Sequence, residues 1–287
     1  MTLRMAVPNK GRLNERAVEL LVKSGLDIGE DWGRKLYIKV RNKDIEVIFV
    51  RAQDIPVFVN SGAVDIGITG QDQVANACVD VKEILPLGFG RCRLSVAVPE
   101  ASGVKCIDDI PDGSRIATSF VNVARNFFAS AGKKVDIVEV TGAAEIMPYM
   151  GVSDFIVDLV SSGSTLKTNR LVEIHAILES EAVVIANQAS LDRCGQDITG
   201  ITNAITSVIN AETKKYLMAD VPRANLKEIE KVFPGLAGPT VMELAGSPDM
   251  VAIHVVVDSN EVYDAVNTLK ELGGTGILTL PIERLVQ

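Results

Sequence analysis

A loop of small hydroxyl-bearing residues follows a short apolar run in this chain. Residues 154–160 read DFIVDLV, which is long enough for a buried parallel strand and too short for a typical helix. Five residues follow it directly: Ser161, Ser162, Gly163, Ser164 and Thr165. Glycine allows close approach to the backbone, and free N–H groups together with hydroxyls donate hydrogen bonds to anions. The loop therefore predicts a phosphate site, although it also fits an ordinary turn that caps a helix.

Two carboxylates lie within the same apolar run. Asp154 opens the run and Asp158 interrupts it. A carboxylate accepts hydrogen bonds, so it suits the two hydroxyls of a ribose diol. Together the loop and the acids would hold a phosphate and the sugar that carries it.

The composition is that of a folded, acidic protein. It has 287 residues, of which 47% are hydrophobic, enough for two or three domains with sizeable cores. The net charge of −8 disfavours general nucleic-acid binding, which needs a basic surface. The four cysteines include no CxxC pair, which argues against a zinc site and a disulfide framework. No signal peptide and no membrane-spanning apolar run is visible, so we expect a cytoplasmic protein with no membrane contact.

The first third of the chain alternates strands and helices through glycine-containing turns, which predicts a parallel α/β sheet. Strands are expected at residues 3–8, 35–40, 45–50 and 63–69. In such sheets ligands bind beyond the carboxyl ends of the strands. Four charged residues follow predicted strands and would converge there, although each alone also fits a helix cap or an ion pair: Lys10, Arg51, Asp54 and Asp72.

The middle of the chain predicts a second α/β lobe, and its end predicts a different domain. The second lobe is expected to contain a helix and these strands: 93–98, 112–119, 135–140 and 171–178. Two strands, 93–98 and 182–186, would cross between the lobes, as in a hinged two-lobed binding protein. After about residue 199 a helix over residues 201–213 leads into the order strand, helix, strand, strand, helix, strand, which is ferredoxin-like.

The two histidines lie in apolar segments. His175 and His254 are each expected to be packed structural residues within a strand. Neither is paired with a serine or cysteine at the spacing of a catalytic triad, so the sequence does not support nucleophilic catalysis.

These motifs resemble those of one known family, the ATP phosphoribosyltransferases in their long form. The most specific match comprises Glu145, Gly151-Val152-Ser153, Ile156-Val157-Asp158-Leu159 and Ser162-Gly163-Ser164-Thr165-Leu166. Supporting matches are Lys10-Gly11-Arg12-Leu13, Val50-Arg51, Gly67-Ile68-Thr69-Gly70, Cys92-Arg93-Leu94 and Arg115-Ile116-Ala117-Thr118-Ser119. The tail matches at Pro234-Gly235, Pro239-Thr240 and Gly276-Ile277-Leu278, so that the resemblance covers nearly the whole chain.

The resemblance implies a fold of class α/β. It would consist of a two-lobed, hinged catalytic body of the type II periplasmic-binding-protein kind and a C-terminal ferredoxin-like (ACT-like) α+β regulatory domain. Lobe I would comprise residues 1–91 and 181–199, lobe II residues 92–180, and the regulatory domain residues 200–287.

The resemblance also implies roles for particular residues. The loop of residues 161–165 would hold the 5-phosphate of phosphoribosyl pyrophosphate, and Asp158, Asp154 and Glu145 would face its ribose as the catalytic acids. ATP and the pyrophosphate would lie against Lys10, Gly11, Arg12, Arg51 and Asp72. The inhibitor histidine would bind at Asp220, Leu236, Thr240 and Gly276.

The implied reaction transfers the phosphoribosyl group to N1 of ATP and releases pyrophosphate, as the first committed step of histidine biosynthesis. Mg²⁺ would accompany the pyrophosphate, on protein ligands that the sequence leaves unknown. Histidine would be a feedback inhibitor, AMP a further ligand, and the protein a homo-oligomer between a dimer and a hexamer. The alternatives are a non-enzymatic two-lobed sensor or binding protein and an inactive homologue. Neither a signal peptide nor a basic DNA-binding helix pair supports the sensor.

Overall fold

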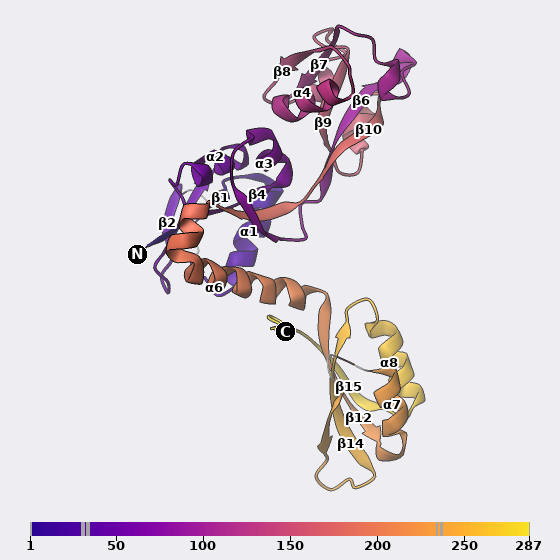
Figure 1. Cartoon of the computed structure of the whole chain (residues 1–287). Coiled ribbons are helices and arrows are strands. Elements are labelled where there is room, and N and C mark those ends of the chain that lie inside the picture. The colour runs from indigo at the N-terminus through magenta and orange to yellow at the C-terminus, as the bar shows by residue number, and fades with distance from the viewer. Residues whose placement is uncertain (1, 30–31, 33–34, 234, 236–237, 287) are drawn as a thin grey trace. The chain divides into compact units, whose positions relative to one another are not determined.

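The computed structural model describes residues 2–29, 32, 35–233, 235 and 238–286 (Figure 1). The chain forms two compact units, one of residues 1–22 and 26–200 and the other of residues 23–25 and 201–287. The first unit contains two sheets and the second contains one. No helix among the described residues has the length and apolar character needed to cross a membrane.

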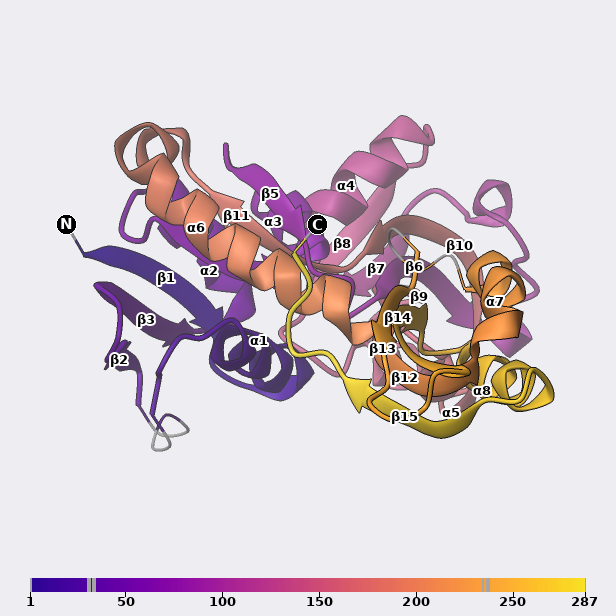
Figure 2. The same ribbon diagram turned by 90° about the horizontal axis from the view of Figure 1, so that it is seen from below.

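The first sheet of unit 1 contains six strands in the order β2-β3-β1-β4-β11-β5, and β2, β3 and β1 lie side by side in Figure 2. The pairs β1–β3 and β1–β4 are parallel, and β11 is antiparallel to β4. Every residue of β4 and β11 is buried, because both faces of a central strand in such a sheet are covered. The strand bounds are β1 Leu3–Pro8, β2 Tyr37–Lys39, β3 Ile45–Val50, β4 Ile66–Gly70, β5 Lys82–Pro86 and β11 Ala182–Ala186.

The second sheet of unit 1 contains five strands in the order β10-β6-β9-β7-β8. Its parallel pairs are β7–β8 and β7–β9, and β6 is antiparallel to β9. The bounds are β6 Cys92–Pro99, β7 Ser114–Thr118, β8 Val135–Glu139, β9 Phe155–Val160 and β10 Leu171–Ser180. The two sheets share one strand arrangement, in which β3-β1-β4-β11 of the first sheet corresponds to β8-β7-β9-β6 of the second. Unit 1 is therefore a two-lobed fold of the type II periplasmic-binding-protein kind.

Helices follow the parallel strands of both lobes, as expected for α/β units. Helix α4 covers one face of the second sheet, where Phe128 and Ala124 pack against Leu94 and Val157. The opposite face is covered by the turn before β9 and by α5, through Ala144 and Leu166. The bounds are α1 Gly11–Lys23, α2 Ile55–Asn60, α3 Gln71–Ala77, α4 Val121–Ser130, α5 Ser164–Thr168 and α6 Gln188–Glu212.

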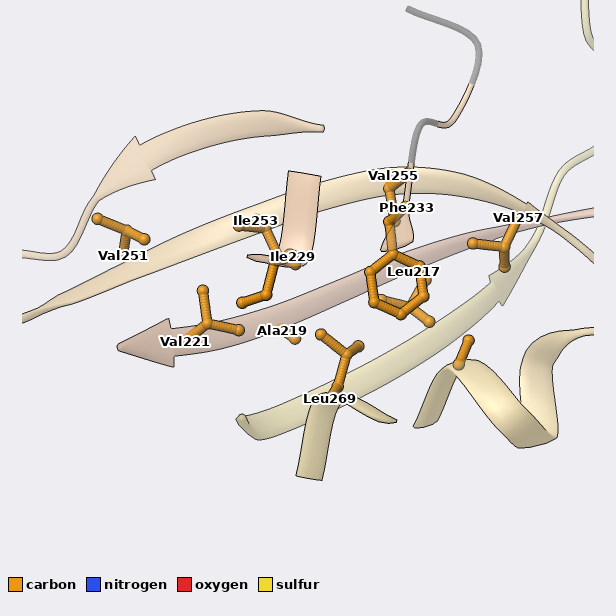
Figure 3. Close-up of a cluster of buried hydrophobic side chains, with 11 residues drawn as sticks. Leu217, Ala219, Val221, Ile229, Phe233, Val251, Ile253, Val255, Val257 and Leu269 are labelled. Atoms are coloured by element: carbon orange, nitrogen blue, oxygen red, sulfur yellow. The ribbon is translucent and has the colours of Figure 1, made fainter. Parts of the chain in front are cut away.

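Unit 2 contains an antiparallel sheet in the order β13-β14-β12-β15, which is the ferredoxin-like order. Residues of β12 and β14 alternate between buried and half-buried, because one face packs on helices α7 and α8. That core contains Leu217, Val255, Phe233 and Leu269 (Figure 3). The bounds are β12 Lys214–Pro222, α7 Leu226–Val232, β13 Thr240–Glu243, β14 Met250–Asp258, α8 Val262–Glu271 and β15 Thr275–Pro281.

Three expectations from the sequence differ from the structure. The helix expected at residues 201–213 is the second half of α6, which begins at Gln188 and has a non-helical residue at Cys194. Strand β5 was not expected, since three of its five residues are charged or proline, which leaves only Ile84 and Leu85 as apolar positions, and it lies at the sheet edge. His175 is exposed rather than packed inside, because β10 is an edge strand, although its ring stacks on Phe127 at 5.1 Å. His254 is half-buried, and its Nδ1 lies 2.7 Å from the Tyr216 hydroxyl.

The core of unit 2 predicts a contrast between two residues of α8. Leu269 is fully buried in the core, so Leu269→Ala should lower the free energy of unfolding by about 2–5 kcal/mol. Tyr263 is 78% exposed on the same helix, so Tyr263→Ala should change the free energy by no more than about 0.5 kcal/mol. Urea unfolding followed by circular dichroism measures both, and equal losses in the two variants would contradict this packing.

Candidate active site

A pocket of about 290 Å³ lies at the carboxyl end of β9. It is lined by the loop that follows the strand and by two acids, Asp158 and Glu145. The structure thus brings together all five residues of the sequence-identified loop, Ser161, Ser162, Gly163, Ser164 and Thr165, with two of the three acids.

The geometry of the loop depends on Gly163. Its φ of +76° is in the left-handed region that only glycine adopts without strain, and it precedes α5 directly. The first N–H groups of a helix have no partner within the helix, so the start of α5 leaves donors beside the pocket. Ser162 and Ser164 place their hydroxyl oxygens 3.0 Å apart in the same turn. Backbone and hydroxyl donors therefore meet at one small pocket, as an anion site requires.

Arg93 supports this loop and was not identified as a site residue from the sequence. Its guanidinium donates to the Ser161 carbonyl at 3.4 Å and holds Glu173 through two hydrogen bonds of 2.5 Å. The Arg93 hydrogen bonds keep the pKa of Glu173 below its usual range. In the antiparallel pairing of β6 with β9, Arg93 lies opposite Val160, the last residue before the loop. The motif Cys92-Arg93-Leu94 does not reveal this pairing register, which brings Arg93 beside the loop after β9.

The two acids of the pocket influence each other. Burial raises the pKa of Asp158, a hydrogen bond from the Leu159 N–H opposes this, and the negative charge of Glu145 raises it further. Glu145 comes from a short helical turn, Ala144–Ile146, that packs beside β9. Both carboxylates are therefore close enough to bind one ligand that carries hydroxyls or positive charge.

The third acid, Asp154, does not line the pocket. It precedes β9, at the opposite end of the strand from the loop, and accepts the Arg115 backbone N–H at 2.8 Å. Its other oxygen pairs with the Arg115 guanidinium at 3.2 Å. These hydrogen bonds hold the pKa of Asp154 below its usual range. The structure does not bring Asp154 to the pocket, and its contacts instead join the starts of β7 and β9.

The first-lobe residues follow the carboxyl ends of three neighbouring parallel strands. Lys10 follows β1 and Arg51 follows β3, and both are exposed. The register pairs Pro8 with Val50, so the two cations leave adjacent strands at the same edge. Gly11, with a φ of +77°, begins α1. Arg12 is in the first turn of α1, and its side chain lies outside the described part of the structure.

Asp72 follows β4 at the same edge but is not free for a ligand. It is 5% exposed, and its Oδ1 accepts a hydrogen bond from Ser180 at 2.7 Å. Its Oδ2 accepts one from Gln73 at 2.6 Å. Asp54, also identified as a residue after a strand, ends a short 3₁₀ turn before α2.

Three of the four tail residues lie on strands of unit 2. Asp220 is on β12, on the face opposite the helices, since Ala219 and Val221 are in the core. A Cβ at Gly276 of β15 would lie 3.1 Å from Asp220 Oδ2, so the glycine leaves this carboxylate open. Thr240 of β13 is exposed. Leu236 lies outside the described residues.

Comparison with known proteins identifies one family. A family model described as HisG: ATP phosphoribosyltransferase matches residues 51–207, and a second, HisG, C-terminal domain, matches residues 211–284. An ATP phosphoribosyltransferase from Methanopyrus kandleri is 47% identical over 98% of this chain and 99% of its own. One from Methanocella arvoryzae is 44% identical over 99% of this chain and 100% of its own.

A solved structure agrees with these matches. The ATP phosphoribosyl transferase (HisG:HisZ) complex from Thermotoga maritima contains a chain that is 30% identical to this one, with a TM-score of 0.65. The similarity covers 73% of this chain and 99% of that chain.

The loop geometry predicts a specific effect of a side chain at Gly163. Gly163→Ala should weaken binding of phosphoribosyl pyrophosphate by about tenfold, since a φ of +76° costs alanine about 1–2 kcal/mol and the loop would change its conformation. Gly151 is the matched control, because its φ is +70°, a Cβ there meets nothing within 4 Å, and it does not line the pocket. Isothermal titration calorimetry measures both, and equal affinities for the two variants would contradict an anion site in this loop.

Proposed function

The chain belongs to the ATP phosphoribosyltransferase family, and we propose that the pocket after β9 and the edge that carries Lys10 and Arg51 are the two halves of its active site. The family reaction transfers the phosphoribosyl group of phosphoribosyl pyrophosphate to N1 of ATP and releases pyrophosphate, as the first step of histidine biosynthesis. Family membership favours this enzyme over a non-enzymatic sensor. The proposed arrangement is supported mainly by one observation, a loop with a left-handed glycine that shares a pocket with two carboxylates.

In the proposed arrangement, the loop of residues 161–165 holds the 5-phosphate. Asp158 and Glu145 then face the ribose, because they line the same pocket. As the bond to pyrophosphate stretches, positive charge develops on the ribose, and the two carboxylates stabilise that charge. Since the pKa of Asp158 is raised by burial, its charge acts in surroundings with little water, where electrostatic stabilisation is strongest.

ATP and the leaving pyrophosphate would lie against Lys10, Gly11, Arg12 and Arg51. Two polyanions must approach each other in this reaction, and exposed cations at the carboxyl ends of β1 and β3 reduce their repulsion. The nucleophile is the adenine nitrogen itself, so the protein needs no nucleophilic serine or cysteine. Most of the rate would come from holding the two substrates in line, which can supply an effective molarity of about 10⁵ M.

Members of the family use a divalent metal ion, and we propose Mg²⁺ for this chain. Among the described residues no group of three or more His, Cys, Asp or Glu side chains could hold a metal. Asp158 and Glu145, whose charges repel, fit an ion that takes its other ligands from phosphate oxygens, as Mg²⁺ often does. When bound, the ion would neutralise charge on the pyrophosphate.

The direct test of the activity is product detection. The protein is incubated with ATP, phosphoribosyl pyrophosphate and Mg²⁺, with pyrophosphatase to remove pyrophosphate, and mass spectrometry searches for phosphoribosyl-ATP. We expect the product in every preparation of folded protein. Its absence from folded protein that still binds both substrates would favour an inactive homologue.

Asp158→Asn should lower kcat and stabilise the protein. Loss of the charge that faces the ribose should lower kcat by on the order of a hundredfold. A raised pKa means that folding disfavours the ionised form, so the penalty exists above the folded pKa and disappears below the ordinary value of 3.8. The variant should therefore have a higher Tm at pH 7 and no advantage near pH 3. A lower Tm at pH 7 with normal kcat would instead assign Asp158 a purely structural role.

We further propose that the chain has three domains: one lobe of residues 1–91 and 181–199, a second lobe of residues 92–180, and a regulatory domain of residues 200–287 that binds histidine. In this proposal the open carboxylate of Asp220 receives the amino group of histidine, and Thr240 and Leu236 complete the site. Histidine needs only to bind one conformation or oligomer more tightly, and a preference of about 1–3 kcal/mol changes activity several-fold or more. AMP would be a second ligand, and the protein a cytoplasmic homo-oligomer between a dimer and a hexamer.

Gly276→Ala tests the histidine site. A Cβ 3.1 Å from Asp220 Oδ2 would obstruct the carboxylate, so the histidine concentration for half-inhibition should rise by about tenfold. Gly246→Ala is the matched control, because its φ is also positive and a Cβ there meets nothing within 4 Å. Assays of product formation across a histidine series measure both, and equal inhibition of the two variants would place the effector elsewhere.

A further inference from the structure

Ser180 lies where the chain passes from one sheet of unit 1 to the other. It is the last residue of β10, and in the second sheet it pairs with Cys92, the first residue of β6. Two residues later the chain enters β11 of the first sheet, where Ala182 pairs with Gly70 of β4. Any contact that Ser180 makes with the first lobe therefore acts at the junction of the two sheets.

The Ser180 hydroxyl makes two hydrogen bonds to a single residue of α3. It donates to Oδ1 of Asp72 at 2.7 Å and accepts the Asp72 backbone N–H at 3.0 Å. Ser180 and Asp72 are each only 5% exposed, so water does not replace these bonds readily.

Adjacent residues repeat this connection. The Gln71 N–H donates to the Glu181 carbonyl at 3.0 Å, and the Glu181 N–H donates to the Gln71 side chain at 3.2 Å. Helix α3 is preceded by Gly70, which has no side chain that could cap it. The crossing segment therefore satisfies the first two N–H groups of α3, which a capping side chain normally helps to satisfy.

The Asp72 carboxylate is held in one orientation by this arrangement. A Cβ at Gly70 would lie 2.1 Å from Asp72 Oδ1, so the carboxylate occupies the space that any other residue at position 70 would fill. The thiol of Cys92 is nearby as well. Burial raises its pKa, the charge of Asp72 raises it further, and a hydrogen bond with Ser180 lowers it.

We propose that Ser180 is a positioning residue for the acceptor side of the reaction: its hydroxyl fixes Asp72 and the first turn of α3 at the carboxyl end of β4. That edge continues from β4 to β1 and β3, where Lys10 and Arg51 follow the strands. The inference rests on the proposed function, because it deepens the role of the edge assigned there to ATP. Both carboxylate oxygens of Asp72 already accept hydrogen bonds, from Ser180 and from Gln73. In this proposal Asp72 therefore orients α3 and does not bind ATP directly.

The test compares Ser180→Ala with Ser114→Ala in steady-state kinetics. Ser114 is a matched control, since it is 7% exposed and its hydroxyl donates one bond of 2.6 Å to Pro111 within the second lobe. Ser180→Ala leaves a buried N–H and a buried carboxylate oxygen without their partner, so the start of α3 should shift. We expect the KM for ATP to rise by about tenfold or more and the KM for phosphoribosyl pyrophosphate to change by less than about twofold. Ser114→Ala should change neither.

A second variant disturbs the same contact from the other side. Gly70→Ala keeps the Ser180 hydroxyl but places a Cβ against Asp72 Oδ1, so it should reproduce the selective rise in the KM for ATP. A folded Ser180→Ala or Gly70→Ala protein whose KM for ATP matches the wild type would overturn the proposal. Failure of both variants to fold, with Ser114→Ala folded, would also overturn it, because the contact would then be structural alone.

Amide hydrogen exchange separates this inference from the proposed function. Ser180→Ala should speed exchange at residues 71–77, whereas Ser114→Ala should not. If the wild-type protein forms no phosphoribosyl-ATP, the proposed function fails, and faster exchange would still establish the serine as the cap of α3. If the wild-type protein is active and Ser180→Ala leaves exchange at residues 71–77 unchanged, Ser180 does not cap α3, and the proposed function remains intact.

Discussion

Backbone N–H groups that are free to bind an anion are rare inside a folded protein, because nearly all of them are already paired. In this chain α5 starts directly after the left-handed Gly163, and the first N–H groups of a helix have no partner within the helix. The turn is held in place by its surroundings, since β9 lies between β6 and β7 and Arg93 bonds the Ser161 carbonyl. A flexible loop on a rigid sheet would bind less well, because it would lose more conformational entropy on binding.

The same topology explains why two substrates can share one enzyme. The same strand order occurs in both lobes: β1 lies between β3 and β4, β7 lies between β8 and β9, and the crossing strands β11 and β6 are antiparallel to their neighbours β4 and β9. Consequently each lobe has its own edge of strand carboxyl ends, one with the loop after β9 and two acids and the other with Lys10 and Arg51. The crossing segment at Ser180 belongs to both sheets, so it is the natural place to set the position of one edge.

Much of this could be predicted from the sequence. Strands β1, β3 and β11 are found at the expected bounds, because continuous apolar runs between turns are a strong local signal. The loop of residues 161–165 lies directly after a strand as expected, since its composition and its place are both local, and its binding of a phosphate stays a prediction. Arg93, Ser180 and the pairing of Asp154 with Arg115 could not be identified in this way, because each depends on register between strands far apart in the chain. The extent of α6 was missed because Gly195, Gly200 and the irregular Cys194 interrupt its helical pattern.

The central claim is that the turn after β9 binds the 5-phosphate of phosphoribosyl pyrophosphate. A crystal structure of the protein with phosphoribosyl pyrophosphate and Mg²⁺ tests it most directly. The account predicts the 5-phosphate within hydrogen-bond distance of the backbone of residues 161–165, with the ribose hydroxyls beside Asp158. A 5-phosphate bound at the edge of Lys10 and Arg51, with the turn after β9 empty, would contradict it.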